Sequence, residues 1–145
     1  MIYCDGATEP CNPGGASGIG CAVFKGEKVI KEYSYFIPAD PKNTNNVAEY
    51  ISFIRALRWI ADNQIADADI TIRGDSMMCV KQLNKEWGIK QGAYVKYAHK
   101  ALALLDEVKK NNTVTIEWVP RVLNEHADML SKKELEKHNV EIRVR

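Results

Sequence analysis

The chain has 145 residues, of which 46% are hydrophobic and 27% are charged, a composition that suits one compact domain with a sizeable core. Its 20 basic and 19 acidic side chains leave a formal net charge of +1, which excludes a strongly basic arm that binds nucleic acid by charge alone. No apolar run is long enough to span a membrane, and no secretory signal opens the chain, so we expect a cytoplasmic protein with no membrane partner.

The first third of the chain is rich in β-branched and aromatic residues that are interrupted by Gly- and Pro-containing turns. The segments Ile2–Cys4, Gly18–Phe24 and Glu27–Phe36 are typical of three successive antiparallel strands joined by hairpins. Pro38 and Pro41 then end this pattern.

From Thr44 to Asn63 the apolar residues recur at three- and four-residue steps, which predicts an amphipathic helix capped by Thr44, Asn45 or Asn46. The remaining chain predicts two strands and three helices, in the order Asp69–Arg73, Ser76–Trp87, Tyr94–Lys110, Val114–Val119 and Asn124–Lys137, where the first and fourth segments are the strands. We therefore expect an α/β fold, a mixed five-stranded sheet flanked by helices, as one domain over residues 1–145. Residues 139–145 are expected to form an extra strand or a flexible tail.

The cysteines Cys4, Cys11, Cys21 and Cys79 show no CxxC spacing, which argues against a zinc site. A chain of this length without an export signal does not need disulfides, so we expect reduced thiols. Cys4 and Cys21 lie in neighbouring predicted strands, so a bond between them stays open.

Four acidic residues fall at the ends of predicted elements or beside apolar faces. Asp5 ends the first strand, Glu49 lies in the first turns of the first helix, Asp75 follows the fourth strand, and Asp128 lies in the last helix. Taken singly, each has an ordinary explanation as a turn former, a helix cap or a helix-surface acid. Taken together, converging carboxylates without basic partners would require a divalent cation, and an all-oxygen site favours Mg²⁺ or Mn²⁺.

These acids lie within four sequence motifs, "IYCDGAT…NPGGASGIG", "TNNVAEY", "RGDS" and "WVPRVLNEHADML". The order and spacing of these motifs resemble those of ribonuclease H, type 1. The resemblance runs from Ile2 to about Leu130, and the last phrase is closest to the compact members of archaea, some bacteria and plants. It implies a metal-dependent endonuclease that cuts the RNA strand of RNA–DNA hybrids and leaves a 5′-phosphate and a 3′-hydroxyl.

The same resemblance implies catalytic and metal-binding roles for all four acids, with two ions roughly 3.5–4 Å apart. Asp5 would bridge both ions, Asp128 would hold the ion that activates water, and Glu49 and Asp75 would hold the ion on the leaving-group side. We expect two Mg²⁺ ions with substrate, Mn²⁺ as a substitute, no organic cofactor and a monomer.

Substrate contacts are also implied by the resemblance. Gly6 and the "NPGG" turn would let the hybrid backbone come close, Asn12, Asn45 and Asn46 would contact the hybrid, and Thr44 would help to hold a phosphate of the DNA strand. The local excess of lysine then predicts a phosphate track of Lys81, Lys85, Lys90 and Lys96, and Trp87 lies either along this track or in the core.

Three features depart from the usual pattern of the family. Met77 stands where many members have a polar residue that faces the minor groove, and the "GIKQGAY" segment is too short for a basic protrusion. The loop before the last acid has no histidine, because His126 lies only two residues before Asp128, and Arg121 is the other candidate for handling product.

Three other functions remain open from the sequence alone. Another nuclease with the same fold, such as a proofreading exonuclease, usually shows Asp-x-Glu on its first strand, whereas Asp5 is followed by Gly6 and Ala7. A non-catalytic binding module would be favoured by the loss of an acid, but all four are present. A domain cut from a longer polymerase or polyprotein also stays open, although Met1 favours a stand-alone chain.

Overall fold

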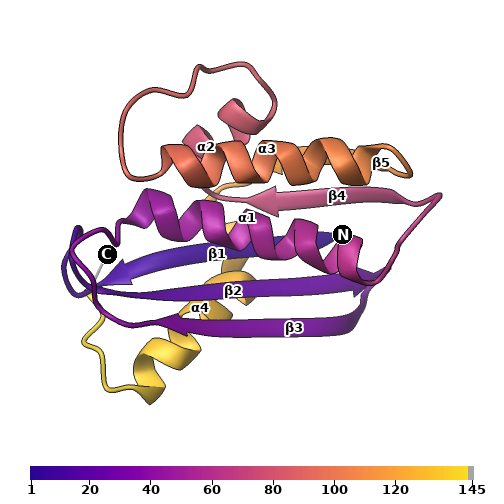
Figure 1. Cartoon of the computed structure of the whole chain (residues 1–145). Helices are drawn as coiled ribbons and strands as arrows, with labels where there is room; N and C mark the ends of the chain where they lie inside the picture. Colours follow the sequence, from indigo (N-terminus) through magenta and orange to yellow (C-terminus); the bar gives the residue numbers. More distant parts are fainter. Residues whose placement is uncertain (144–145) are drawn as a thin grey trace.

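The computed structural model describes residues 1–143, and it contains one mixed sheet with helices on both faces (Figure 1). The strands are β1 (Ile2–Glu9), β2 (Ala16–Lys25), β3 (Lys28–Ile37), β4 (Asp69–Gly74) and β5 (Thr113–Trp118). Their order in the sheet is β3-β2-β1-β4-β5, in which β1, β2 and β3 pair antiparallel and β1, β4 and β5 pair parallel. The predicted five-stranded mixed sheet is therefore confirmed.

The first strand is longer than the sequence predicts, and Asp5 lies inside it rather than at its end. Residues Gly6 to Glu9 continue to pair with β2, so that Asp5 faces Gly20 and Glu9 faces Ala16. The small side chains of Gly6 and Ala7 concealed this extension, because β-propensity scales disfavour both residues in strands. Asp5 is therefore presented from a rigid strand.

The helices are α1 (Asn45–Asp62), α2 (Met77–Leu83), α3 (Val95–Lys109) and α4 (Glu125–Lys137), and a short 3₁₀ helix, η1 (Arg121–Asn124), leads into α4. Thr44 caps α1 through a hydrogen bond that its hydroxyl accepts from the amide of Val47, as expected from the sequence. The second helix ends earlier than predicted, at Leu83, because the backbone of Lys85 adopts a positive φ of 61° that no helix can contain.

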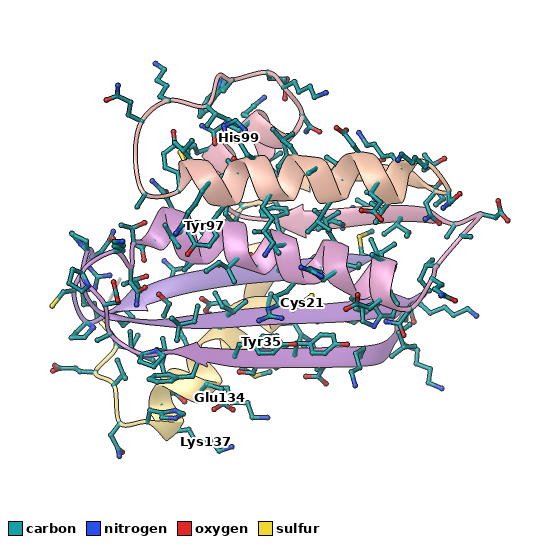
Figure 2. The ribbon with its side chains drawn as sticks, viewed as in Figure 1. Cys21, Tyr35, Tyr97, His99, Glu134 and Lys137 are labelled. Atoms are coloured by element: carbon teal, nitrogen blue, oxygen red, sulfur yellow. The ribbon has the colours of Figure 1, made fainter. Side chains whose placement is uncertain are left out.

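Side chains alternate between the two faces of β2 and so build two different packing layers. Cys21 and Val23 belong to the core beneath α1 and α3, whereas Gly18 and Gly20 lie against the backbone of α4. Figure 2 marks α3 by Tyr97 and His99 and α4 by Glu134 and Lys137, which lie on either side of the sheet. On the side opposite β2, β1 pairs with β4 only at Ile2 and Tyr3, so the rest of that edge of β1 has no strand neighbour.

The last described residues form no strand, which excludes an extra strand over 139–143, and residues 144–145 of the predicted tail lie outside the described residues. The tail is instead bound to β1 by Arg143. Its backbone amide and its Nε each donate to Oε2 of the fully buried Glu9 at 2.9 Å, and its Nη2 donates to the carbonyl of Thr8 at 2.8 Å.

All four cysteines are free. Cys4 and Cys21 are direct partners in the β1–β2 register, and burial raises the pKa of Cys21 to about 12 and that of Cys4 well above its ordinary value. Both thiols are thereby kept protonated and unreactive. Separately, none of the helices in the part of the chain that the structure describes is long and apolar enough to cross a membrane.

We predict that Gly20→Ala lowers the free energy of unfolding by about 1–3 kcal/mol, because the added methyl group overpacks the β2–α4 contact. A Cβ atom at Gly20 would lie 2.2 Å from the carbonyl oxygen of Ala127. Urea unfolding measures the effect, and Gly88→Ala is the matched control because a Cβ atom there meets open space. Equal stability of the two variants would contradict the proposed packing.

Candidate active site

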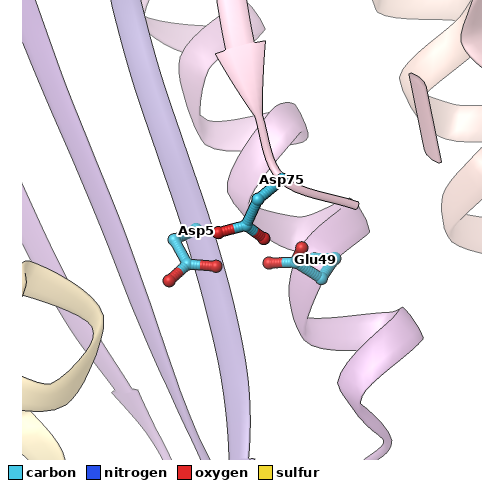
Figure 3. A group of neighbouring side chains, drawn as sticks. All are labelled: Asp5, Glu49 and Asp75. Carbon is cyan, nitrogen blue, oxygen red and sulfur yellow. The ribbon is translucent and has the colours of Figure 1, made fainter. Parts of the chain in front are cut away.

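The site forms where β1 and β4 separate. The two strands pair only at Ile2–Ile72 and Tyr3–Arg73, after which β4 ends and β1 continues alone on that side. Asp5 extends from β1, Asp75 follows β4, and Glu49 reaches in from α1 (Figure 3). One carboxylate oxygen from each of these three residues lies within 4.8 Å of the others.

Glu49 is held by the backbone of β1. Its Oε1 accepts a hydrogen bond of 2.5 Å from the amide of Gly6, a group that faces the gap left by β4. This approach requires glycine, because a Cβ atom at Gly6 would lie 2.3 Å from the carbonyl oxygen of Ala48 in α1. Gly6 thus has a packing role besides its predicted contact with a hybrid, which stays a prediction.

Asp75 is positioned by Asn124, a residue that lies within the "WVPRVLN" motif but to which the sequence assigned no role. The amide Nδ2 of Asn124 donates to the carbonyl of Cys4 at 2.9 Å and to Oδ2 of Asp75 at 3.3 Å. Its Oδ1 is buried and has no hydrogen-bond partner among the described residues. An asparagine at the start of a helix is usually read as a cap, so its position gave no sign of this long-range contact.

Asp128 lies on α4 beside this cluster, but its carboxylate is paired with basic side chains. Oδ2 accepts a hydrogen bond of 2.9 Å from Nζ of Lys132, and Oδ1 lies 3.7 Å from Nη2 of Arg121. Lys132 was not predicted as a partner of Asp128, although its position four residues after Asp128 on a helix is a signal for such a pair.

The pKa values separate these acids into two kinds. Burial, together with the charges of Asp75 and Asp128, raises the pKa of Asp5 to about 8. Burial, and then the charge of Asp5, raises the pKa of Glu49 well above its ordinary value. Partial burial opposes ionisation of Asp128 as well, but hydrogen bonds with Lys132 and Asp5, together with the charges of Lys132 and Arg121, outweigh it and lower the pKa of Asp128.

Clustered oxygen donors without a basic partner fit a hard divalent cation. None of the ion pairs found among residues 1–143 involves Asp5, Glu49 or Asp75. A divalent ion would supply the missing positive charge, and carboxylate oxygens are the ligands that Mg²⁺ and Mn²⁺ prefer. The three residues could therefore hold one ion, and Asp128 is near enough to influence the pKa of Asp5.

A cleft of about 200 Å³ opens onto the cluster, and it contains four of the predicted substrate contacts. Its lining is Asp5, Gly6, Asn45, Asn46, Glu49, Asp75, Ser76 and Arg121. Asn46 and Arg121 are exposed there, and Arg121 lies beside Asp128, whereas Oδ1 of Asn45 accepts a hydrogen bond from the amide of Thr8.

The other predicted contacts lie around this cleft. Oδ1 of Asn12 accepts a hydrogen bond of 3.1 Å from the amide of Asn45, and the hydroxyl of Thr44 caps α1. Met77 is 41% exposed at the start of α2. Asn12 and Thr44 thus hold the start of α1, and Met77 is exposed at the start of α2. The contacts of all three with substrate stay predictions.

The predicted lysine track follows α2, the loop after it and the start of α3. Lys85, Lys90 and Lys96 are exposed, and Lys81 forms an ion pair of 3.5 Å with Glu86. Trp87 in the same loop is 48% exposed, which excludes the alternative of a packed core tryptophan.

The family model for RNase H matches residues 1–136. The chain belongs to the RNase H family. Ribonuclease HI of Halobacterium salinarum is 34% identical over 135 residues, which are 92% of this chain and 63% of that protein. The bifunctional protein Rv2228c of Mycobacterium tuberculosis is 32% identical over 133 residues, which are 90% of this chain and 34% of that protein.

Solved RNase H1 structures share the fold. The crystal structure of RNase H1 from H. salinarum NRC-1 has a TM-score of 0.80 at 31% identity and covers 94% of this chain and 96% of its own. LC11-RNase H1, solved in complex with an RNA/DNA hybrid, has a TM-score of 0.83 at 28% identity and covers 95% and 97%. The predicted RNase H fold is confirmed, and membership of the RNase H family supports the predicted ribonuclease H enzyme.

We predict that Asp5→Asn stabilises the metal-free protein at pH 8. The raised pKa of Asp5 makes its ionisation unfavourable in the fold, so the contribution of Asp5 to stability is greatest below its ordinary pKa of 3.8 and is lost as the pH rises to about 8. In chelator at pH 8 the variant should exceed the wild type by about 1 kcal/mol or more in the free energy of unfolding. Denaturant titrations at pH 4 and pH 8 measure this gap, and an equal gap at both values would contradict it.

We also predict that His126→Ala retains more than about a tenth of wild-type turnover, since the contacts of His126 are with Glu32 and Phe24 on the neighbouring strands. Its Nε2 lies 3.2 Å from Oε2 of Glu32, and its ring packs edge-on against Phe24. Steady-state kinetics measures the effect, and a hundredfold loss would assign His126 to the reaction.

Proposed function

We propose that this chain hydrolyses the RNA strand of RNA–DNA hybrids and leaves 5′-phosphate and 3′-hydroxyl ends. The observation that supports this most is the cluster of Asp5, Glu49 and Asp75, which forms where β4 ends beside the middle of β1, in a chain of the RNase H family. We further propose that it acts as a cytoplasmic monomer and needs no organic cofactor. Because the chain spans only 34–63% of the length of the two curated relatives described above, the activity of any longer protein is also a proposal.

Four carboxylates would hold two Mg²⁺ ions, for which Mn²⁺ would substitute. Asp5 would bridge both, Asp128 would bind the ion on the side of the attacking water, and Glu49 and Asp75 would bind the ion on the leaving-group side. When bound, the ions supply an activated water and stabilise the attacking and leaving oxygens of an in-line displacement.

The residues of the chain itself fix the orientation of these ligands. The amide of Gly6 restrains Glu49, and Asn124 restrains Asp75, so neither carboxylate has to be ordered when substrate arrives. Both restraints come from groups anchored in the β1 region, which keeps the ligands in register with Asp5.

Recognition of a hybrid is supported by the shape and polarity of the cleft. RNA is distinguished from DNA through its 2′-hydroxyl, which lies in the wide and shallow minor groove of A-like helices. Asn46 and Arg121 line the cleft with exposed polar side chains suited to such contacts, and the lysines Lys81, Lys85, Lys90 and Lys96 would follow a phosphate backbone. The similar LC11-RNase H1 was solved with an RNA/DNA hybrid bound.

The test is cleavage of a labelled RNA–DNA hybrid with Mg²⁺, with Mn²⁺ and with chelator, with duplex RNA and duplex DNA as controls. We expect metal-dependent cutting of the RNA strand of the hybrid only. Asp5→Asn should reduce cleavage below detection while hybrid binding stays within about threefold, because the substitution removes a ligand and not a substrate contact. Asp69→Asn, at an exposed position at the start of β4, is the matched control and should cut normally.

Equal cutting of duplex RNA would contradict the proposed specificity. Absence of cutting with either metal would contradict the proposed reaction. If Asp5→Asn binds hybrid poorly but still cleaves it, the role assigned to Asp5 is wrong.

A further inference from the structure

The four carboxylates differ in the charge that faces them. Asp5, Glu49 and Asp75 form no ion pair with any described residue, whereas both oxygens of Asp128 face cations. Lys132 makes the shorter contact, 2.9 Å, and Arg121 lies farther away at 3.7 Å. A divalent ion that binds Asp128 must therefore share or displace a positive charge that is already present.

We infer that Lys132 is an internal counter-cation that occupies Asp128 until a divalent ion replaces it, so that the two ion sites fill in a fixed order. This inference rests on the proposed two-ion function. The first ion binds Asp5, Glu49 and Asp75 without competition from the chain. The second ion, which needs Asp128, binds only as Lys132 moves away.

The geometry of the pair suits such an exchange. Lys132 lies one helical turn after Asp128 on α4, and the side chains of Lys132 and Asp128 are 30% and 21% exposed. The pair is thus less screened than a fully exposed one and still open to solvent on one side. The flexible stem of lysine lets its ammonium group swing out while α4 stays in place.

Substrate phosphates would shift this balance. Mg²⁺ binds weakly through one or two carboxylates and gains affinity when phosphate oxygens complete its shell. Asp128, helped only by the Asp5 carboxylate that the first ion already uses, therefore competes poorly for a second ion against an attached ammonium group. Substrate would supply the oxygen ligands that make displacement of Lys132 favourable, so the second site would be completed mainly in the presence of substrate.

The test measures ion binding in the absence of nucleic acid. Isothermal titration with Mn²⁺, supported by electron paramagnetic resonance to detect a coupled ion pair, should show one ion on the wild type and a second only at much higher concentration. Lys132→Met removes the charge and keeps the length of the stem, so we expect it to bind the second ion at least about tenfold more tightly. Lys132→Arg keeps the charge and should behave more like the wild type.

Lys133→Met is the matched control, because Lys133 is exposed and none of the ion pairs found in the described chain joins it to Asp128. Binding of the second ion that stays within about twofold in Lys132→Met, or that tightens equally in Lys133→Met, would overturn the inference. A wild type that binds no Mn²⁺ would overturn it as well.

The same proteins separate this inference from the proposed function. If Lys132→Met gains the second ion but the wild type fails to cut hybrid, the counter-cation role stands and the proposed reaction falls. If instead the wild type cuts hybrid but Lys132→Met binds the second ion no more tightly than the wild type, only the role of Lys132 is wrong. If both hold, the Mg²⁺ concentration for half-maximal cleavage should be lower in Lys132→Met than in Lys133→Met.

Discussion

The early end of β4 leaves one edge of β1 without a strand partner, and the site depends on how that edge is satisfied. Buried backbone groups need hydrogen-bond partners. Here three side chains supply them, because Asn124 donates to the carbonyl of Cys4, Glu49 accepts from the amide of Gly6, and Asn45 accepts from the amide of Thr8. The groups that complete the sheet edge are therefore also the groups that build the site.

This arrangement explains why acidic groups are concentrated at a position that disfavours their charge. Asp5 and Glu49 are buried together, so burial raises the cost of ionising both, and the charge of Asp5 raises it further for Glu49. The fold tolerates them because strand and helix positions are set by packing elsewhere in the core. Asp128 differs because its neighbours on η1 and α4 already neutralise it, so the cluster is asymmetric before any ion binds.

The sequence predicted most of the fold because helix caps and apolar spacing are local signals, as Thr44 and α1 illustrate. It placed Asp5 at a strand end because Gly6 and Ala7 look unlike a strand, and only pairing with β2 shows otherwise. The four acids were identified from the sequence motifs around them, and the carboxylates of three of them, Asp5, Glu49 and Asp75, lie close together in the structure. Asn124 was missed because its partners, Cys4 and Asp75, are distant in the sequence, a relation that periodicity does not encode.

Arg143 joins the last described segment of the chain to the end of β1, where Glu9 leads into the turn that carries Asn12. Both ends of the described chain therefore bind to the β1–β2 hairpin. Arg143 binds at its turn, and the amino group of Met1 donates to the carbonyl of Phe24 at its other end. The last described residues are therefore fixed beside the β1–β2 turn, in which Asn12 accepts a hydrogen bond from the first residue of α1.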